Sequence, residues 1–390
     1  MKVLIMSVTA GEGHNSTAKA MRQEFESREI ECVILDTFDY VSPELAKFIS
    51  EGYLLITEKA KYAYQIGYNL AEKRKNLLKD YSPMGILNMI FTDEIEAYLA
   101  GEDFDAVVFT HPFAGMILDM MKKKHKLNIH TVGILTDFTF HPYWENCTRN
   151  DYVVIPSRML KFQGIRKGFK EEQLVPLGIP INPKFSVKRT KAEARQTLGL
   201  PFGESKKMIL VMGGSMGYGN IAETVKRIDS VGVDTDFHMY VVCGNNAEAK
   251  EEVSALAGEV KHSMTVVGFV DYISTLMDAA DCIVTKPGGL TTSESMAKNL
   301  PMVIVNPIPG QEQRNTEFLV NNGAAICASK SCPIEECLYG LLTSEVRLGA
   351  MVECVKELAK PESSKNVCSF VVDLMHTPYM ESAEEETFRK

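Results

Sequence analysis

Residues 282–311 read CIVTKPGGLTTSESMAKNLPMVIVNPIPGQ, and this stretch predicts the fold class. A short apolar run at 282–285 precedes a Pro-Gly-Gly turn, then a helix that opens near residues 291–294, then a second apolar run at 302–305. This succession is a βαβ unit, whose two strands must lie parallel. We therefore expect an α/β protein built on parallel sheets.

The Pro-Gly-Gly turn is also a predicted ligand site. Gly288 and Gly289 let a ligand approach the backbone. Hydroxyls where the helix N-terminus exposes free N–H groups and a partial positive charge come from Thr291, Thr292 and Ser293. Such a turn is typical of phosphate binding. Glu294, placed in the first helical turn, would accept hydrogen bonds from a ribose diol. The alternative is that Thr291 or Thr292 caps the helix and Glu294 closes a capping box.

Length and composition narrow the class of protein. A chain of 390 residues suits two domains, and a net charge of −9 argues against a nucleic-acid binder. Nine cysteines without a CxxC pair argue against a zinc site or a disulfide framework and favour a reducing cytosol. No run approaches the ~20 apolar residues that span a bilayer, and residues 2–8 form a first strand rather than a signal peptide. We expect a cytoplasmic protein whose membrane role is peripheral.

A second glycine turn, TAGEGHN at residues 9–15, follows the first strand. Gly11 and Gly13 before a helix, with Asp36 at the end of the next strand, fit a dinucleotide-binding fold and an NAD-dependent oxidoreductase. Two features weaken this hypothesis. The third glycine position holds Ser16, and an imidazole stands where a pyrophosphate would need an open backbone.

His14 supplies that imidazole, at the start of a helix predicted over residues 16–27. Glycines that permit close approach, beside an imidazole at the carboxyl edge of a parallel sheet, suit a general base better than a cofactor. The alternative is that His14 only helps to cap the helix.

Polar residues follow the other strands predicted in this half, at 105–110, 130–136 and 151–156. His111 comes after the first of them, and Asp137 and His141 after the second, so all three are expected to converge on His14. Asp137 would orient or charge-stabilise a catalytic imidazole. We expect His111 and His141, taken singly, to be structural.

The only tryptophan of the chain lies in the same loop. Trp144, with Tyr143, would stack against a sugar face or shield a lipid.

Residues 44–100 differ from the rest of the chain in composition and pattern. They show helical patterns, aromatic side chains and basic residues at 73–75 and 79. They predict either an interfacial membrane contact or a lipid-lined pocket, or else a plain helical insertion that packs on the core. The basic run at 122–126 would attract anionic lipid by about 1 kcal/mol per charge, or simply complement a helix end.

The alternation of strands and helices restarts after a proline-rich crossing at residues 175–190. Strands are predicted at 207–212, 238–243, 264–267, 282–285, 302–306 and 324–328, and a helix at 366–375 would return to the first half. Two doubly wound sheets facing one another across a cleft follow from this pattern. In the second, the loops at 213–217, 268–270 and 288–294 would contact phosphate, base and ribose respectively.

Four motifs in this order, SVTAGEGHNSTA at 7–18, GGSMG at 213–217, KPGGLTTSE at 286–294 and PGQE at 309–312, carry a family resemblance. The chain resembles GT-B glycosyltransferases of the monogalactosyldiacylglycerol synthase and processive diacylglycerol glucosyltransferase family over nearly its whole length. The resemblance implies two Rossmann-like domains. Residues 1–185 would bind the acceptor, residues 186–365 would bind the UDP-sugar, and a helix at about 366–380 would pack back on the first.

The resemblance also implies roles for single residues. His14 would deprotonate the acceptor hydroxyl with help from Asp137. Ser215 and Thr291 would contact the pyrophosphate, Phe269 and Val270 the uracil, Glu294 the ribose, and Gln311 with Glu312 the hexose. The implied donor-binding set is Gly13, Gly214, Ser215, Gly217, Phe269, Val270, Gly288, Gly289, Leu290, Thr291, Glu294, Gln311 and Glu312.

The implied reaction moves glucose or galactose from a UDP-sugar to a lipid acceptor such as diacylglycerol, with inversion and without a metal or another cofactor. The expected partners are a UDP-hexose, the lipid acceptor and the anionic inner face of the cell membrane, but no nucleic acid. A UDP-N-acetylglucosamine transferase, a nucleotide-sugar 2-epimerase and a non-catalytic UDP-sugar sensor stay open as alternatives. The pattern does not choose between donor sugars, which differ by the placement of single groups.

Overall fold

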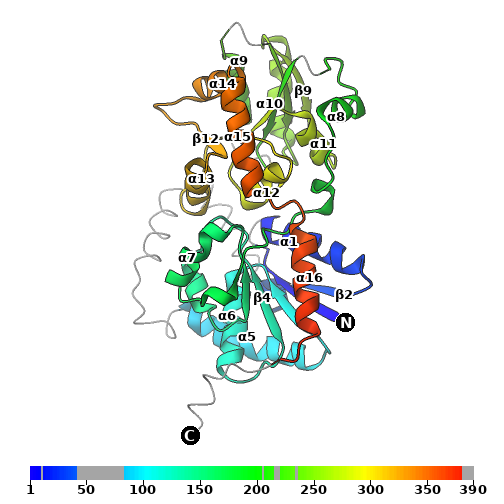
Figure 1. The fold of residues 1–390 in the computed structure, drawn as a ribbon, viewed down its shortest axis with the longest axis vertical. Helices are drawn as coiled ribbons and strands as arrows, with labels where there is room; N and C mark the ends of the chain where they lie inside the picture. Colours follow the sequence, from blue (N-terminus) through cyan, green and yellow to red (C-terminus); the bar gives the residue numbers. More distant parts are fainter. Residues whose placement is uncertain (10–11, 42–82, 204–205, 215–219, 233–235, 380–390) are drawn as a thin grey trace. The chain divides into compact units, whose positions relative to one another are not determined.

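The computed structural model describes residues 1–9, 12–41, 83–203, 206–214, 220–232 and 236–379 (Figure 1). The chain divides into two compact units: unit 1 comprises residues 1–182 and 362–390, and unit 2 comprises residues 183–361. The sequence places this boundary at residues 185 and 186. Predictions for residues 44–82, including the basic cluster at 73–79, lie outside the described residues.

Unit 1 is built on a six-stranded parallel sheet with the order β2-β1-β3-β4-β5-β6. Its strands are β1 (Lys2–Ser7), β2 (Glu31–Asp36), β3 (Ala106–Phe109), β4 (His130–Ile134), β5 (Tyr152–Val154) and β6 (Leu174–Val175). The short β6 ends at Val175, the first residue of the stretch predicted as an interdomain crossing. The direction of winding reverses between β1 and β3, so a ligand crevice is expected where these two strands end.

Helices cover both faces of this sheet and make its connections. They are α1 (Glu12–Glu26), α2 (Thr37–Val41), α5 (Pro83–Ala100), α6 (Pro112–Lys123), η1 (Pro142–Asn146), η2 (Arg158–Leu160), α7 (Lys161–Arg166), η3 (Glu171–Gln173) and α16 (Ser363–Met375). Among the described residues, none of these or of the unit 2 helices combines the length and the apolar character that crossing a bilayer requires.

The last helix that the structure describes belongs to the core of unit 1. α16 packs against α1, β3 and β4, and Figure 1 shows it, in red, beside the blue α1. Its Val367, Cys368 and Val371 are fully buried in one cluster with Phe25 of α1. The Ser364 hydroxyl also donates a hydrogen bond of 2.5 Å to the carbonyl of Ile181. The helix predicted at 366–375 therefore begins three residues earlier and completes the amino-terminal unit.

Trp144 is a core residue, and the prediction that it contacts a sugar or lipid is wrong. Its side chain is 2% exposed and stacks on Phe109 with ring centroids 5.8 Å apart. Gly115 and Gly133 make room for the Phe109 ring, because a Cβ at either position would lie within 2.6 Å of it. A Cβ at Gly133 would also lie 3.0 Å from the Trp144 ring, so the absence of a side chain there leaves room for both rings in the core.

The basic run at 122–126 ends α6, and its first lysine does not face solvent. Lys122 is buried and donates hydrogen bonds to both carboxylate oxygens of Asp151, at 2.7 and 2.9 Å, and to the Tyr379 hydroxyl. Lys126 is exposed and pairs with Glu96 at 2.5 Å. These ion pairs contradict a lipid-attracting role for Lys122 and favour the interpretation of the run as a helix end.

Unit 2 repeats the architecture with the order β12-β11-β10-β7-β8-β9, again all parallel. Its strands are β7 (Lys207–Met212), β8 (Phe237–Val242), β9 (Ser263–Val267), β10 (Cys282–Thr285), β11 (Met302–Ile304) and β12 (Ala325–Cys327). The parallel pairing of β10 with β11, predicted from the Pro-Gly-Gly stretch, is confirmed. The winding reverses between β7 and β10.

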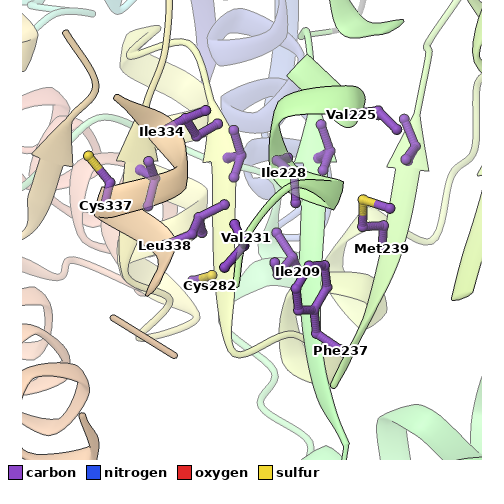
Figure 2. Packing of buried hydrophobic residues seen from close by; sticks show 14 of the residues in the cluster. Ile209, Val225, Ile228, Val231, Phe237, Met239, Cys282, Ile334, Cys337 and Leu338 are labelled. Atoms are coloured by element: carbon purple, nitrogen blue, oxygen red, sulfur yellow. The ribbon is translucent and has the colours of Figure 1, made fainter. Parts of the chain in front are cut away.

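The core of unit 2 lies between this sheet and helices from both its early and late sequence. Figure 2 shows Val225 and Ile228 together with Ile209, Met239 and Phe237 of the central strands, all fully buried. The same figure labels Ile334, Cys337 and Leu338 from a late helix beside them. Largely apolar strands with both faces covered are typical of a parallel sheet.

The helices of unit 2 are η4 (Pro183–Phe185), α8 (Lys191–Thr197), α9 (Ile221–Asp229), α10 (Ala247–Ala255), η5 (Leu256–Gly258), α11 (Ile273–Ala279), α12 (Gly289–Ala297), α13 (Gln311–Asn321), α14 (Ile334–Leu342) and α15 (Glu345–Leu358). The two sheets with their covering helices confirm the predicted α/β class of two doubly wound domains.

Candidate active site

The first glycine turn is shorter than the sequence predicts. α1 begins at Glu12 rather than at residue 16, so His14 lies inside the first helical turn. The two glycines suggest a longer loop, but a glycine is tolerated in a first turn, where the N–H groups have no intrahelical partner. The helix therefore aims the His14 ring at the ends of the central strands.

His14 forms its hydrogen bonds across the sheet edge rather than with its own helix. Its Nδ1 lies 2.6 Å from the carbonyl oxygen of Thr110, just after β3, and 3.3 Å from the Thr136 hydroxyl after β4. A carbonyl oxygen only accepts, so Nδ1 carries the proton and Nε2 of the neutral ring keeps its lone pair. This geometry contradicts the helix-capping alternative and leaves Nε2 as a proton acceptor.

The surroundings of His14 keep the ring neutral. Burial lowers the pKa of His14, while the charge of Asp137 and the hydrogen bond to Thr110 oppose that shift. A pKa below the ordinary value means that the imidazole is unprotonated at neutral pH and able to take a proton. The negative charge of Asp137 would also stabilise the imidazolium that forms when His14 takes a proton.

Two further imidazoles gather at the same edge, as predicted. The rings of His14 and His111 meet edge to face with centroids 4.8 Å apart. His111 Nδ1 accepts a hydrogen bond from the Phe113 N–H and caps α6, and His141 Nδ1 accepts one from the Tyr143 N–H and caps η1. Burial lowers the pKa of both, that of His141 to about 4. Their structural roles are confirmed.

Asp36 is occupied by the backbone around it. One carboxylate oxygen accepts a hydrogen bond of 2.9 Å from the Thr9 N–H, and the other accepts from the N–H groups of Phe38 and Asp39. Asn15 bridges Ser7 and Thr9 behind it, with bonds of 2.6 and 2.9 Å. The carboxylate that a dinucleotide site would need for ribose thus fixes the glycine turn instead.

In unit 2, α12 begins at Gly289, directly on the Pro-Gly-Gly turn, and not near residue 291. Its N-cap is Gly288, which has no side chain to cap with, and the capping-box alternative is therefore wrong. A Cβ built on Gly288 would meet no atom within 4 Å. The turn thus presents the first N–H groups of a helix, free of any capping side chain, to open space, which is the geometry that anions use.

Glu294 lies one turn further along α12 than predicted, in its second turn, where it is half-buried. Burial raises its pKa to about 8, against the opposing charge of Lys184. A carboxyl group that is neutral near pH 7 donates as well as accepts hydrogen bonds, which suits a diol partner.

A cavity of about 20 Å³ lies at the winding reversal of unit 2, where β7, β10 and β11 end. It is lined by Val211, Met212, Gly213, Asn220, Ile221, Thr224, Val284, Lys286, Val305 and Asn306. No role was predicted for Lys286 or Asn306. Lys286 directly follows the buried strand β10, and Asn306 lies two residues after the buried strand β11. Gly214, with φ of 79°, continues this edge, whereas Ser215 and Gly217 lie outside the described residues.

The remaining predicted residues of unit 2 lie on neighbouring loops. Phe269 follows β9 and is 65% exposed. Gln311 and Glu312 open α13, where Glu312 accepts a hydrogen bond of 2.7 Å from the Ile308 N–H. Buried Asn315, which the sequence reasoning missed, donates to the Pro287 carbonyl at 2.9 Å and so ties α13 to the Pro-Gly-Gly turn.

Comparison with known protein families divides the chain in the same way. Residues 14–181 match the model for monogalactosyldiacylglycerol synthase, and residues 208–367 match the model for the glycosyltransferase family 28 C-terminal domain. The first match covers the edge with His14, and the second covers the cavity and the α12 turn.

A curated protein and two solved structures extend the comparison. A processive diacylglycerol beta-glucosyltransferase of Bacillus cereus (strain AH187) is 28% identical and covers 99% of this chain and 98% of its own. MurG of Acinetobacter baumannii superposes with a TM-score of 0.65 at 15% identity, over 95% of this chain and 99% of its own. The UDP-GlcNAc 2-epimerase of Neisseria meningitidis superposes with a TM-score of 0.57 at 13% identity, over 96% of this chain and 100% of its own. At these identities the two structures are evidence for the fold alone.

Proposed function

We propose, from the premise that the chain is a GT-B glycosyltransferase of the monogalactosyldiacylglycerol synthase and diacylglycerol glucosyltransferase family, that it transfers a hexose from a UDP-sugar to a lipid alcohol such as diacylglycerol. The observation that carries the proposal is that the two units present different chemical groups. A neutral imidazole with a free Nε2 stands in the unit that matches the synthase model, and an uncapped helix N-terminus stands in the unit that matches the transferase model.

In this proposal His14 is the general base. Its Nε2 takes the proton from the acceptor hydroxyl as the hydroxyl oxygen attacks C1 of the sugar. Thr110 holds the required tautomer through Nδ1, and Asp137 stabilises the imidazolium that forms. A single displacement of this kind inverts the configuration at C1.

The donor is held by unit 2. The first N–H groups of α12 and the hydroxyl of Thr291 would neutralise the diphosphate, both in the bound donor and as UDP departs. Backbone donors of this kind supply the charge compensation that other transferases obtain from a metal ion, so we propose a metal-independent reaction. The other contacts follow the family: Gly214, Ser215 and Gly217 at the phosphates, Phe269 and Val270 at the base, Glu294 at the ribose, and Gln311 with Glu312 at the hexose.

The acceptor sets where the enzyme works. A diacylglycerol hydroxyl lies at the surface of a bilayer, so we propose that the protein acts as a peripheral enzyme on the inner face of the cell membrane. The reaction requires that the acceptor hydroxyl and the donor sugar be held in alignment, so positioning of the two substrates should matter as much as the base.

Product analysis tests the proposal. Purified protein would be incubated with a panel of UDP-sugars, with and without diacylglycerol vesicles, and products identified by mass spectrometry. We expect hexosyl-diacylglycerol and UDP only where a UDP-hexose and the lipid are both present. Consumption of UDP-N-acetylglucosamine without acceptor would instead indicate an epimerase, and donor binding without release of UDP would indicate a sensor.

A further inference from the structure

Three large apolar side chains are exposed within seven residues of unit 1. Met159 of η2 is 44% exposed, and Phe162 and Ile165 of α7 are 76% and 43% exposed. No other seven-residue stretch among the described residues holds three exposed large hydrophobic side chains. Their spacing of three residues places them on one side of two consecutive short helices. Figure 1 labels α7 at the margin of unit 1.

The opposite side of these helices is locked to the domain, so the apolar side cannot turn inward. Gly164 lies so close to β6 that a Cβ there would meet the Leu174 side chain at 2.7 Å. The Gln163 side chain accepts a hydrogen bond of 2.7 Å from the Phe140 N–H and donates one of 3.2 Å to the Thr139 hydroxyl. The exposed side chains are therefore a fixed feature of the folded unit.

Basic side chains surround the apolar ones. Residues 158–170 carry five lysines and arginines and no acidic residue, although the whole chain has a net charge of −9. Arg158, Arg166 and Lys170 are exposed, and Lys161 and Lys167 are half-exposed. Glu171 pairs with Lys161 at 3.1 Å. We call Arg158, Met159, Lys161, Phe162, Ile165, Arg166, Lys167 and Lys170 the basic apolar surface.

We propose that the basic apolar surface docks on an anionic lipid bilayer, with Met159, Phe162 and Ile165 entering the interface and the cations around them contacting lipid phosphates. A protein of net negative charge is repelled by such a bilayer everywhere except at a local cationic patch, so the position of the charges selects the docking side. This inference deepens the proposed function, because it names the surface through which the enzyme reaches its lipid acceptor.

The docking surface is joined to the candidate acceptor site through Gln163. The two residues that Gln163 holds, Thr139 and Phe140, belong to the loop that begins with Asp137 and ends with His141. A membrane contact on α7 would therefore place the loop that surrounds His14 close to the lipid surface. Thr136, directly before this loop, lies 3.3 Å from Nδ1 of His14, so the base and α7 contact the same stretch of chain.

Vesicle flotation of the full chain tests the inference without any turnover. The vesicles would be phosphatidylcholine alone, or phosphatidylcholine with an equal part of phosphatidylglycerol. We expect wild-type protein to float with the anionic vesicles, less so as salt is raised. Phe162→Ser should weaken this binding about tenfold, and Arg166→Ala about fivefold on the anionic vesicles alone. Matched controls are Val346→Ser, an 85% exposed valine of unit 2, and Lys226→Ala, an exposed lysine of α9.

The outcomes separate this inference from the proposed function. Unchanged flotation of the Phe162 and Arg166 variants, equal loss in both controls, or wild-type binding that ignores lipid charge would each overturn the docking surface. Unaltered thermal unfolding of the variants checks that the fold is intact. Phe162→Ser should also keep wild-type turnover on detergent-dispersed diacylglycerol. If the wild type makes no glycolipid there, the proposed function fails while the flotation result still decides the docking surface.

Discussion

The carboxyl edges of the two sheets differ in the groups that they present, which are side chains in unit 1 and backbone N–H groups in unit 2. In unit 1 three imidazoles and the carboxyl of Asp137 lie together at this edge. Asp36 and Asn15 fix the glycine turn beside them through their own hydrogen bonds. In unit 2 the edge around α12 is built from backbone, with a glycine as N-cap and no capping side chain.

The difference fits the task that the proposed function gives to each edge. Moving a proton requires a titratable side chain whose pKa and orientation are set, whereas holding a diphosphate requires several N–H donors at fixed positions. Substitutions should therefore separate the two edges: changes in unit 1 should affect turnover, and changes at the α12 turn should affect donor affinity.

The largest expected effect comes from removing the imidazole base. His14→Ala should lower turnover by about 10²–10⁴-fold, the usual contribution of a positioned general base, while the affinity for UDP stays at the wild-type value. Steady-state kinetics and calorimetric titration with UDP measure the two quantities. His376→Ala, at an exposed histidine beyond α16, serves as the control. Retained turnover would contradict the assignment of the base.

A single methyl group should produce the opposite pattern in unit 2. Gly288→Ala is compatible with the fold, because its φ of −67° and ψ of 142° suit any residue and the new Cβ meets no protein atom. The methyl would occupy the space expected for phosphate, so UDP affinity should fall by about tenfold or more. Gly349→Ala, another glycine with open space, should leave the affinity unchanged. Equal UDP affinity in both variants would place the donor elsewhere.

Glu294 should make unit 2 less stable as pH rises. Its pKa is raised from 4.5 to about 8 on folding, so between these values the folded state holds a proton that the unfolded chain releases. Stability then falls with rising pH, by at most about 1.4 kcal/mol per pH unit, and is constant above pH 8 with respect to this group. The glutamine of Glu294→Gln cannot titrate, so the stability of this variant relative to the wild type should increase as pH rises across that range. Unfolding midpoints of the wild type and Glu294→Gln that run parallel from pH 5 to 8 would show that the Glu294 carboxyl does not hold this proton.

The smallest effect is expected from the charge beside the base. Asp137 raises the pKa of His14, so Asp137→Asn should shift the acid limb of the kcat/KM profile to lower pH. Turnover at neutral pH should fall by about tenfold at most, because the tautomer of His14 is held by Thr110 and not by Asp137. An acid limb that moves to higher pH, or stays in place, would show that Asp137 does not act on this ring.

Much of the fold was predictable because the apolar runs are long and bounded by glycine and proline. The strands Lys207–Met212 and Cys282–Thr285 have the bounds that the sequence predicts, and the gathering of His111 and His141 around His14 follows from the parallel arrangement alone. Loop residues after parallel strands converge whatever their conformation.

The errors arose where local signals competed with packing. Glycines at 11–13 and 288–289 suggested loops, but both helices begin within these runs, which moved His14 into a helix and Glu294 into a second turn. Trp144 is buried against Phe109 and beside Gly133, residues that are distant from it in sequence. Lys122 and the exposed face of α7 were misjudged or missed because partners and exposure are properties of the folded unit.

The return of α16 to unit 1 has a consequence for how the chain is made. Val367, Cys368 and Val371 close the hydrophobic core of the amino-terminal unit, yet they leave the ribosome only after all of unit 2. Unit 2, which is contiguous, has its full set of core residues first. During synthesis unit 1 must therefore wait with an open apolar groove along α1 until α16 emerges, so a nascent chain arrested after residue 361 should expose that groove to chaperones.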